Sequence, residues 1–142
     1  MGRLMGGVTP GQRDGAPRPT RSSVHRFTLA DEHDLLLQQV AVRTEDLLTA
    51  AEKGGWPGRE LTALLDYLRT EVLRQVVDEE LLLLAHHEVH AQTAGLIHDH
   101  VRLRAGVETL AEAAVNADRY SSSEVSGIAA DLFAQLERHC SA

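Results

Sequence analysis

The amino-acid sequence predicts an all-α protein: an antiparallel up-down four-helix bundle that follows a disordered N-terminal tail. Aliphatic residues recur at alternating steps of four and three in four stretches, which is the spacing of one face of an α-helix. Hydrophobic residues make up 43% of the chain but aromatic residues only 4%, so Leu and Ala supply most of the packing and favour helices. Short connections between amphipathic helices place neighbours antiparallel, which favours the bundle.

The N-terminal segment differs in composition from the rest of the chain. Residues 1–25 are rich in Gly, Pro, Arg, Ser and Thr and lack apolar periodicity, so we expect a disordered basic tail. The bundle should then occupy residues 26–142. A basic tail can contact an acidic partner, but it is more often simply solvated.

The first two helices have recognisable ends. Thr28 with Asp31 is typical of a capped helix start, and Gly54-Gly55 should end this helix after about Ala51. The predicted buried face of the first helix consists of His33, Leu37, Val40, Thr44, Leu47 and Ala51. Trp56-Pro57 should begin the second helix, which continues to about Ala85. Its buried face consists of Leu61, Leu65, Leu68, Val72, Gln75, Glu79 and Leu82.

The last two helices follow after the stretch 85–93, which is either a loop or an extension of the second helix. The third helix should bury Leu96, His100, Leu103, Val107, Leu110 and Ala114. A polar break follows over residues 116–123, in which Ser121 and Glu124 form a capping box. The fourth helix should bury Val125, Ala129, Leu132, Leu136 and His139.

Composition also limits the class of protein. The net charge of −7 argues against nucleic-acid binding, and no stretch of uncharged apolar residues is long enough to span a membrane. We see no secretory signal. The single cysteine, Cys140, rules out internal disulfides and a Cys-based zinc site and fits a reducing compartment, so we expect a cytoplasmic protein.

Polar residues interrupt each apolar face at one level of the predicted bundle. His33 lies near the start of the first helix, Glu79 near the end of the second, His100 near the start of the third and His139 at the end of the fourth. In an up-down bundle these positions share one end, so we expect their side chains to converge within about 8 Å of Glu79. Imidazoles and a carboxylate in a dry core suit iron or zinc.

Other metal or phosphate motifs fit less well. His87-Glu88-Val89-His90 is one residue short of the metalloprotease motif, and the sequence has no Glu-x-x-His pairs of the ferritin-like kind. His98-Asp99 is similar to the dipeptide of HD phosphohydrolases but has no further set of ligands. A phosphotransfer histidine should be exposed, whereas His100 lies on the buried face. His86 and His90 are more typical of a solvated patch.

The four interruptions resemble the motifs of the hemerythrin-like, or HHE cation-binding, family. Its members are four-helix bundles with a His early in the first helix, His-x-x-x-Glu late in the second, a His in the third and His-x-x-x-Glu in the fourth. Residues 31–36, 75–85, 98–104 and 136–139 are similar to these motifs in order. The resemblance implies iron, two ions in family members, and binding, sensing or storage of oxygen, nitric oxide or iron rather than enzymatic turnover.

The chain departs from the family pattern at two positions. Gln75 stands where a His is expected, and the Glu of the fourth motif falls beyond Ala142, so we expect a shortened last helix. His33, Glu79, His100 and His139 therefore suit one ion better than two, with Gln75 and Glu80 as outer or weak partners. The alternative is a metal-free helical interaction module that has lost the site. Metal binding requires neutral histidines, so we expect their folded pKa to lie below about 6.5.

Overall fold

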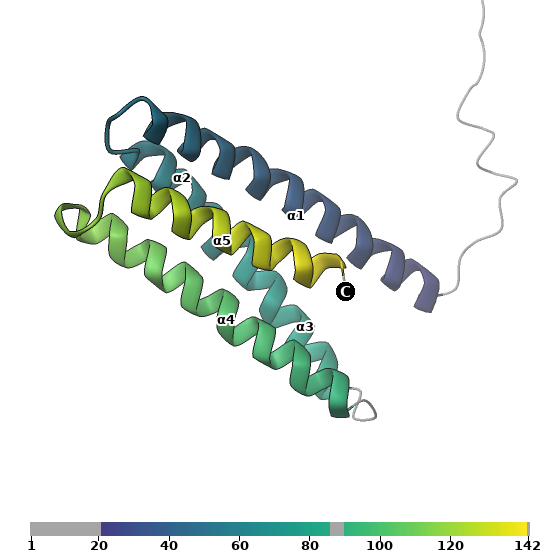
Figure 1. The fold of residues 1–142 in the computed structure, drawn as a ribbon. Coiled ribbons are helices and arrows are strands. Elements are labelled where there is room, and N and C mark those ends of the chain that lie inside the picture. The colour runs from purple at the N-terminus through teal and green to yellow at the C-terminus, as the bar shows by residue number, and fades with distance from the viewer. Residues whose placement is uncertain (1–20, 86–89, 142) are drawn as a thin grey trace, which may run out of the picture. The chain divides into compact units, whose positions relative to one another are not determined.

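The protein is described by a computed structural model, in which residues 21–85 and 90–141 are placed (Figure 1). The helices are α1 (Arg21–Glu52), α2 (Gly58–Tyr67), α3 (Leu73–Ala85), α4 (His90–Val115) and α5 (Ser122–Ser141). A π-helical turn, η3 (Leu68–Val72), joins α2 to α3, and a short 3₁₀ turn, η4 (Ala117–Arg119), precedes α5. The described residues contain no strand, and the predicted all-α class is confirmed.

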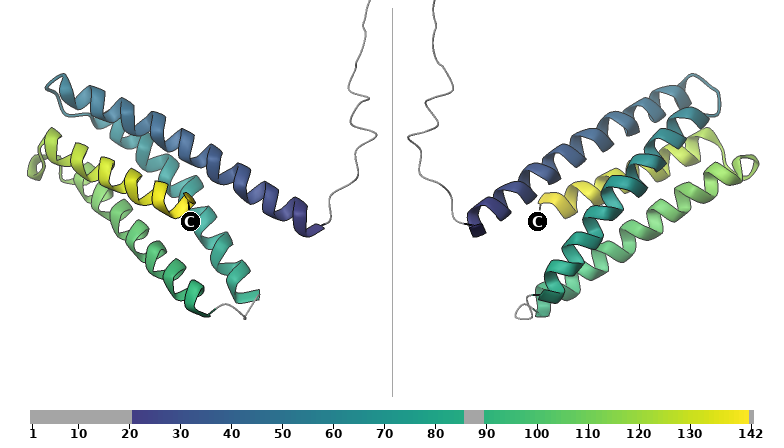
Figure 2. Two further views of the ribbon diagram at one scale, coloured as in Figure 1. Left: turned by 45° about the vertical axis from the view of Figure 1, so that its right-hand side comes forward. Right: turned by 180° about the vertical axis from the view of Figure 1, so that it is seen from behind.

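The chain divides into two units, Met1–Glu32 and His33–Ala142. The second unit contains the bundle, to which α1 contributes its residues from His33 onward. Within it, α2, η3 and α3 form one continuous rod that begins beside the end of α1 and ends beside the start of α4 (Figures 1 and 2). With this rod counted as one helix, the predicted up-down order of four helices is confirmed.

The helix ends follow the local sequence, with one exception. Gly54 has a positive φ of 95° just after α1, a backbone conformation that glycine adopts without a steric penalty. At the start of α5, the backbone N–H of Glu124 donates to Oγ of Ser121 at 3.0 Å, and Glu124 Oε1 accepts from the Ser121 N–H at 2.8 Å. The predicted capping box is therefore confirmed.

The exception is the start of α1, which is Arg21 rather than Thr28. No Gly or Pro occurs between Arg21 and Lys53, so nothing in the local sequence stops the helix from extending past Thr28. The predicted start is therefore wrong. The expected disorder of the tail falls mainly on residues 1–20, which lie outside the described residues, as do residues 86–89 of the uncertain connection.

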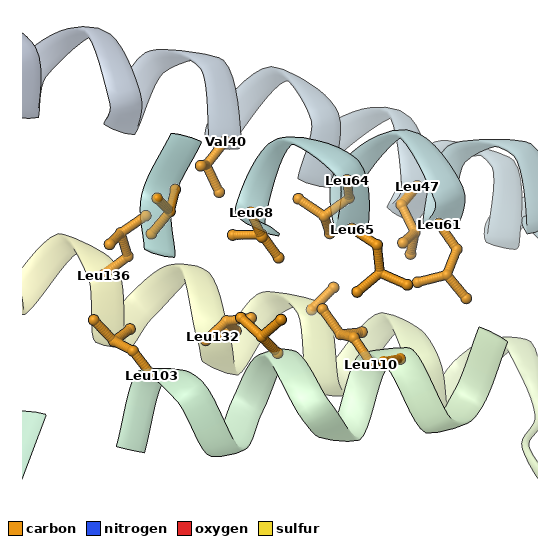
Figure 3. Close-up of a cluster of buried hydrophobic side chains, with 14 of the residues drawn as sticks. Val40, Leu47, Leu61, Leu64, Leu65, Leu68, Leu103, Leu110, Leu132 and Leu136 are labelled. Atoms are coloured by element: carbon orange, nitrogen blue, oxygen red, sulfur yellow. The ribbon is translucent and has the colours of Figure 1, made fainter. Parts of the chain in front are cut away.

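The core consists of aliphatic side chains from α1, the α2–α3 rod, α4 and α5, which point into a common interior (Figure 3). Most predicted face residues are buried, including Val40, Leu68, Leu103, Leu110 and Leu136. The predictions missed Leu36, Leu64 and Val76, which are buried as well, and wrongly placed Ala114 inside instead of Ala113. Within the described part of the chain, no helix is long and apolar enough to cross a membrane.

Candidate metal centre

Three histidine side chains from three helices meet around the carboxylate of a residue on a fourth helix. Oε2 of Glu79 on α3 accepts a hydrogen bond from Nε2 of His33 on α1 at 2.6 Å. Its other oxygen, Oε1, lies 2.8 Å from Nε2 of His100 on α4 and 3.1 Å from Nε2 of His139 on α5. The predicted convergence of the four residues is confirmed.

The helix order explains this meeting. His33 and His100 lie in the first halves of α1 and α4, whereas Glu79 lies toward the end of the rod formed by α2, η3 and α3, and His139 lies in the last turn of α5. Antiparallel neighbours bring the start of one helix to the level of the end of the next. The aliphatic layers above the site therefore fix its depth in the bundle.

Glu79 is an anion in a largely dry environment, with only 9% of its surface exposed. Burial alone raises the pKa of this carboxyl group, but hydrogen bonds from His100, His139 and His33 outweigh burial and hold its pKa well below the usual value. Three imidazole groups therefore replace the water that an ionised carboxylate requires.

His100 is fully buried and lies between two carboxylates. Its Nε2 faces Glu79, and its Nδ1 lies 3.0 Å from Oε2 of Glu80. Burial lowers the pKa of His100, but the hydrogen bonds to Glu79 and Glu80 outweigh burial and raise it. Our expectation of a lowered pKa is wrong for this residue, because burial was considered without the second carboxylate.

Glu80 is held in turn by Arg104, one helical turn after His100. The guanidinium nitrogens of Arg104 donate to both Glu80 oxygens, at 2.9 and 3.1 Å. These bonds, with the weaker influence of His100, lower the pKa of Glu80. The sequence identified Glu80 as an outer partner but missed Arg104, although the four-residue spacing of His100 and Arg104 puts both on one side of the helix.

His139 packs against His100 with ring centroids 5.1 Å apart. Its Nδ1 lies 3.7 Å from Oδ2 of Asp99, which is too long for a hydrogen bond. A cavity of about 180 Å³ reaches this side of the ring and is lined by Asp99, Arg102, Leu103, Gln135, Arg138 and His139. The outer face of His139 therefore borders a space open to small solutes.

Gln75 occupies a different environment one turn before Glu79. Only 7% of Gln75 is exposed, and its amide nitrogen has no hydrogen-bond partner among the described residues. Gln75, His33, Glu79 and Cys140 border a cavity of about 10 Å³ together with apolar side chains. Burial, and then the charges of Glu79 and Asp34, raise the pKa of the Cys140 thiol to about 11.

Of the other sequence candidates, the structure describes two. His98 is exposed, and the buried His100 is inaccessible to a phosphate donor. His86 lies outside the described residues, as does the side chain of His90, so the pair cannot be placed. The HD and phosphotransfer interpretations therefore gain no support from the described part of the chain.

One group of potential metal ligands occurs among the described residues: Glu79, His100 and His139, whose donor atoms all lie within 4.8 Å of one another. The donor set fits a transition metal, because it combines imidazole nitrogens with a carboxylate. The distances from Glu79 Oε1 to the Nε2 atoms of His100 and His139, 2.8 and 3.1 Å, are close to the ~3.0 Å between adjacent ligands around an ion with bonds of about 2.1 Å. The chemistry of the residues present therefore fits a transition-metal ion.

Comparison with protein families gives one match. The family model described as the hemerythrin HHE cation binding domain matches residues 26–142. Comparison with curated proteins and with solved structures gives no match. The family match thus covers the bundle and all four residues of the buried cluster.

Proposed function

Because the chain belongs to the hemerythrin family of HHE cation-binding domains, we propose that it binds iron and acts through small ligands of iron. In this proposal it binds, senses or stores oxygen, nitric oxide or iron itself, and it does not turn over an organic substrate. The family supports binding of a cation; the choice of iron and the physiological role are our proposal.

The observation that carries this proposal is the buried carboxylate of Glu79 with imidazoles on both of its oxygens. Leucine and valine side chains line the small cavity beside it, and only 9% of Glu79 is exposed, so water provides little of the compensation that an isolated charge would need. Bound ferrous iron would supply a redox-active centre with affinity for diatomic ligands. His100, His139 and Glu79 are the residues that would hold it, through Nε2, Nε2 and a carboxylate oxygen.

The chain's own residues prepare the site for an ion. Glu80 accepts a hydrogen bond from Nδ1–H of His100, and Arg104 holds Glu80 in place. Nε2 of His100 is then the atom that can bind a metal, once the proton on Nε2 is lost. Such carboxylate–histidine links orient metal ligands and raise their basicity. Glu79 stays ionised under ordinary conditions because its pKa is lowered. The proton on Nδ1 of His100 and the charge of Glu79 are therefore set before an ion binds.

The space beside the cluster supports a small ligand rather than an organic substrate. The cavity bordered by His33, Gln75 and Glu79 has a volume of about 10 Å³, which is room for about one water-sized molecule. The larger cavity beside Asp99 is lined by His139 but not by His33, Glu79 or His100. This limit on size favours a diatomic ligand or the ion alone.

The test uses protein purified without a histidine tag and loaded with ferrous iron under anaerobic conditions. We expect bound iron after desalting, with changes in the visible spectrum on addition of oxygen or nitric oxide. Glu79→Gln and His139→Gln should lose the iron, whereas His98→Gln should keep it, since His98 is an exposed histidine on α4. Retention of no iron by the folded parent protein would instead favour the metal-free interaction module.

A further inference from the structure

The two oxygens of Glu79 serve different halves of the cluster. Oε1 faces two imidazole nitrogens, those of His100 at 2.8 Å and His139 at 3.1 Å. Oε2 faces only one, that of His33 at 2.6 Å. A carboxylate that bridges two ions needs further ligands beside each of its oxygens. We call the residues beside Oε1 the Oε1 half and those beside Oε2 the Oε2 half; the ligands in each half decide how many ions the chain can hold.

The Oε1 half is complete enough for one ion. Its three donor atoms lie within 4.8 Å of one another, and they come from three different helices. Two ligands of the same ion are separated by at most about 4.2 Å, twice a bond length of about 2.1 Å, so the most widely separated donor atoms must approach each other by up to about 0.6 Å to share one ion. His33 does not belong to this compact set, because its nitrogen approaches the opposite oxygen of Glu79.

Among the residues that the structure describes, the Oε2 half lacks the donors for a second ion. Besides His33, the polar side chain there is Gln75, a neutral amide that binds iron poorly compared with imidazole and whose nitrogen has no partner among the described residues. The small cavity there is also lined by His139, whose Nε2 faces Oε1, by Cys140 and by apolar side chains, those of Leu36, Val72, Val76, Leu103 and Leu136. A volume of about 10 Å³ leaves no room for the waters that would complete the coordination of a second ion.

We propose that this chain holds a single metal ion on Glu79, His100 and His139, and that His33 is a positioning residue instead of a ligand. The proposal rests on the proposed metal-binding function and specifies its site. Two histidines and one carboxylate form the ligand set of mononuclear iron sites, and they leave further positions for small ligands. His33 donates to Oε2 and thereby turns Oε1 toward the other two histidines.

The experiment measures metal stoichiometry and affinity by equilibrium dialysis against Co²⁺ and, without oxygen, Fe²⁺. We expect one ion per chain in the parent protein. His139→Gln should lower the affinity by more than a hundredfold. His33→Gln should keep a stoichiometry of one and lose less than tenfold, because the Gln amide can still donate to Oε2. Cys140→Ser and His98→Gln should match the parent.

X-ray absorption of the loaded parent protein provides the second readout, in which we expect no metal–metal scattering near the ~3.5–4 Å typical of paired ions. Two ions per chain, such scattering, or equal losses of affinity in His33→Gln and His139→Gln would overturn the single-ion site while leaving metal binding intact. Binding of no ion at all would overturn the proposed function and the single-ion site together. Circular dichroism of each variant establishes that it has folded.

Discussion

Nδ1 of His100 lies 3.0 Å from Oε2 of Glu80, while Nε2 of the same ring faces Glu79. The two neighbouring carboxylates therefore contact opposite edges of one imidazole. Arg104 donates to both oxygens of Glu80 and prevents its rotation. The imidazole of His100 is therefore fixed at both nitrogens before any ion binds.

This relationship predicts the effect of removing Glu80. Glu80→Gln should weaken metal binding by about 10–100-fold without changing the stoichiometry, because partners of metal-bound histidines contribute affinity of that order. Arg104→Gln should have a smaller effect in the same direction. Calorimetric titration with Co²⁺ measures both. Glu71→Gln is the control, since Glu71 pairs with the exposed Arg74; an equal loss in that variant would contradict the prediction.

The pKa directions predict how the metal-free protein responds to pH. The lowered pKa of Glu79 adds stability above its usual value of 4.5, and this stability is lost as pH falls through the folded pKa. The raised pKa of His100 adds stability below its usual value of 6.5, and this is lost as pH rises through the folded pKa. Both contributions are present together between about pH 4.5 and 6.5.

The metal-free protein should therefore resist urea more strongly at pH 5.5 than at pH 8, and Glu79→Gln should reduce this difference. A metal ion takes the place of the proton on Nε2 of His100. The stability that bound metal adds should therefore increase from pH 5.5 to pH 8, whereas the stability of the metal-free protein decreases. Urea unfolding at both pH values, with and without Co²⁺, measures these trends. The same pH difference in parent and Glu79→Gln would show that the buried cluster does not cause it.

Gln75 offers a test of its unpartnered amide. A buried donor without a partner costs about 1–3 kcal/mol, so Gln75→Met should stabilise the metal-free protein by about 1 kcal/mol, since Met has a similar length. Gln38→Met, at an exposed position on α1, should change stability by less than about 0.5 kcal/mol. Thermal unfolding measures both variants. Destabilisation by Gln75→Met would mean that the amide has a partner in solution.

Adding a side chain at Gly106 on α4 should produce a steric clash with α5. A Cβ atom at this position would lie 2.7 Å from Cδ1 of Leu132, which is buried. Glycine within a helix costs about 0.5–1 kcal/mol relative to alanine, whereas overpacking a core costs about 1–3 kcal/mol. Gly106→Ala should therefore destabilise the protein by about 1 kcal/mol.

Gly127→Ala is the matched control for this substitution. Nothing lies within 4 Å of a Cβ at Gly127, which is also inside a helix, so only the helix propensity changes. We expect this variant to gain about 0.5–1 kcal/mol. Stabilisation by both substitutions in urea would show that α4 and α5 separate easily at Gly106.

The sequence predicted the bundle because helical periodicity and topology act together. Steps of four and three identify one row of residues, and short connections make the rows antiparallel. One row is narrower than the face a helix buries, which is why Leu36, Leu64 and Val76 were missed. The π-helical turn at Leu68–Val72 left no signal in the local sequence, since its residues fit an ordinary helix.

The candidate site was also accessible from the sequence, but its internal arrangement was not. Depth along each helix brought His33, Glu79, His100 and His139 to one level. Which oxygen of Glu79 faces which histidine depends on side-chain rotamers, and these are set by packing. The raised pKa of His100 depends in part on its contact with Glu80, the residue after Glu79. Helical periodicity does not predict this contact.

The central claim is that Glu79, His100 and His139 hold the ion. Crystals of the metal-loaded protein, measured at an absorption edge of the metal, test it most directly through the anomalous difference map. We predict one peak per chain, about 2.0–2.2 Å from Nε2 of His100, Nε2 of His139 and a carboxylate oxygen of Glu79. A peak at other residues, or a loaded crystal without a peak in the core, would contradict the claim.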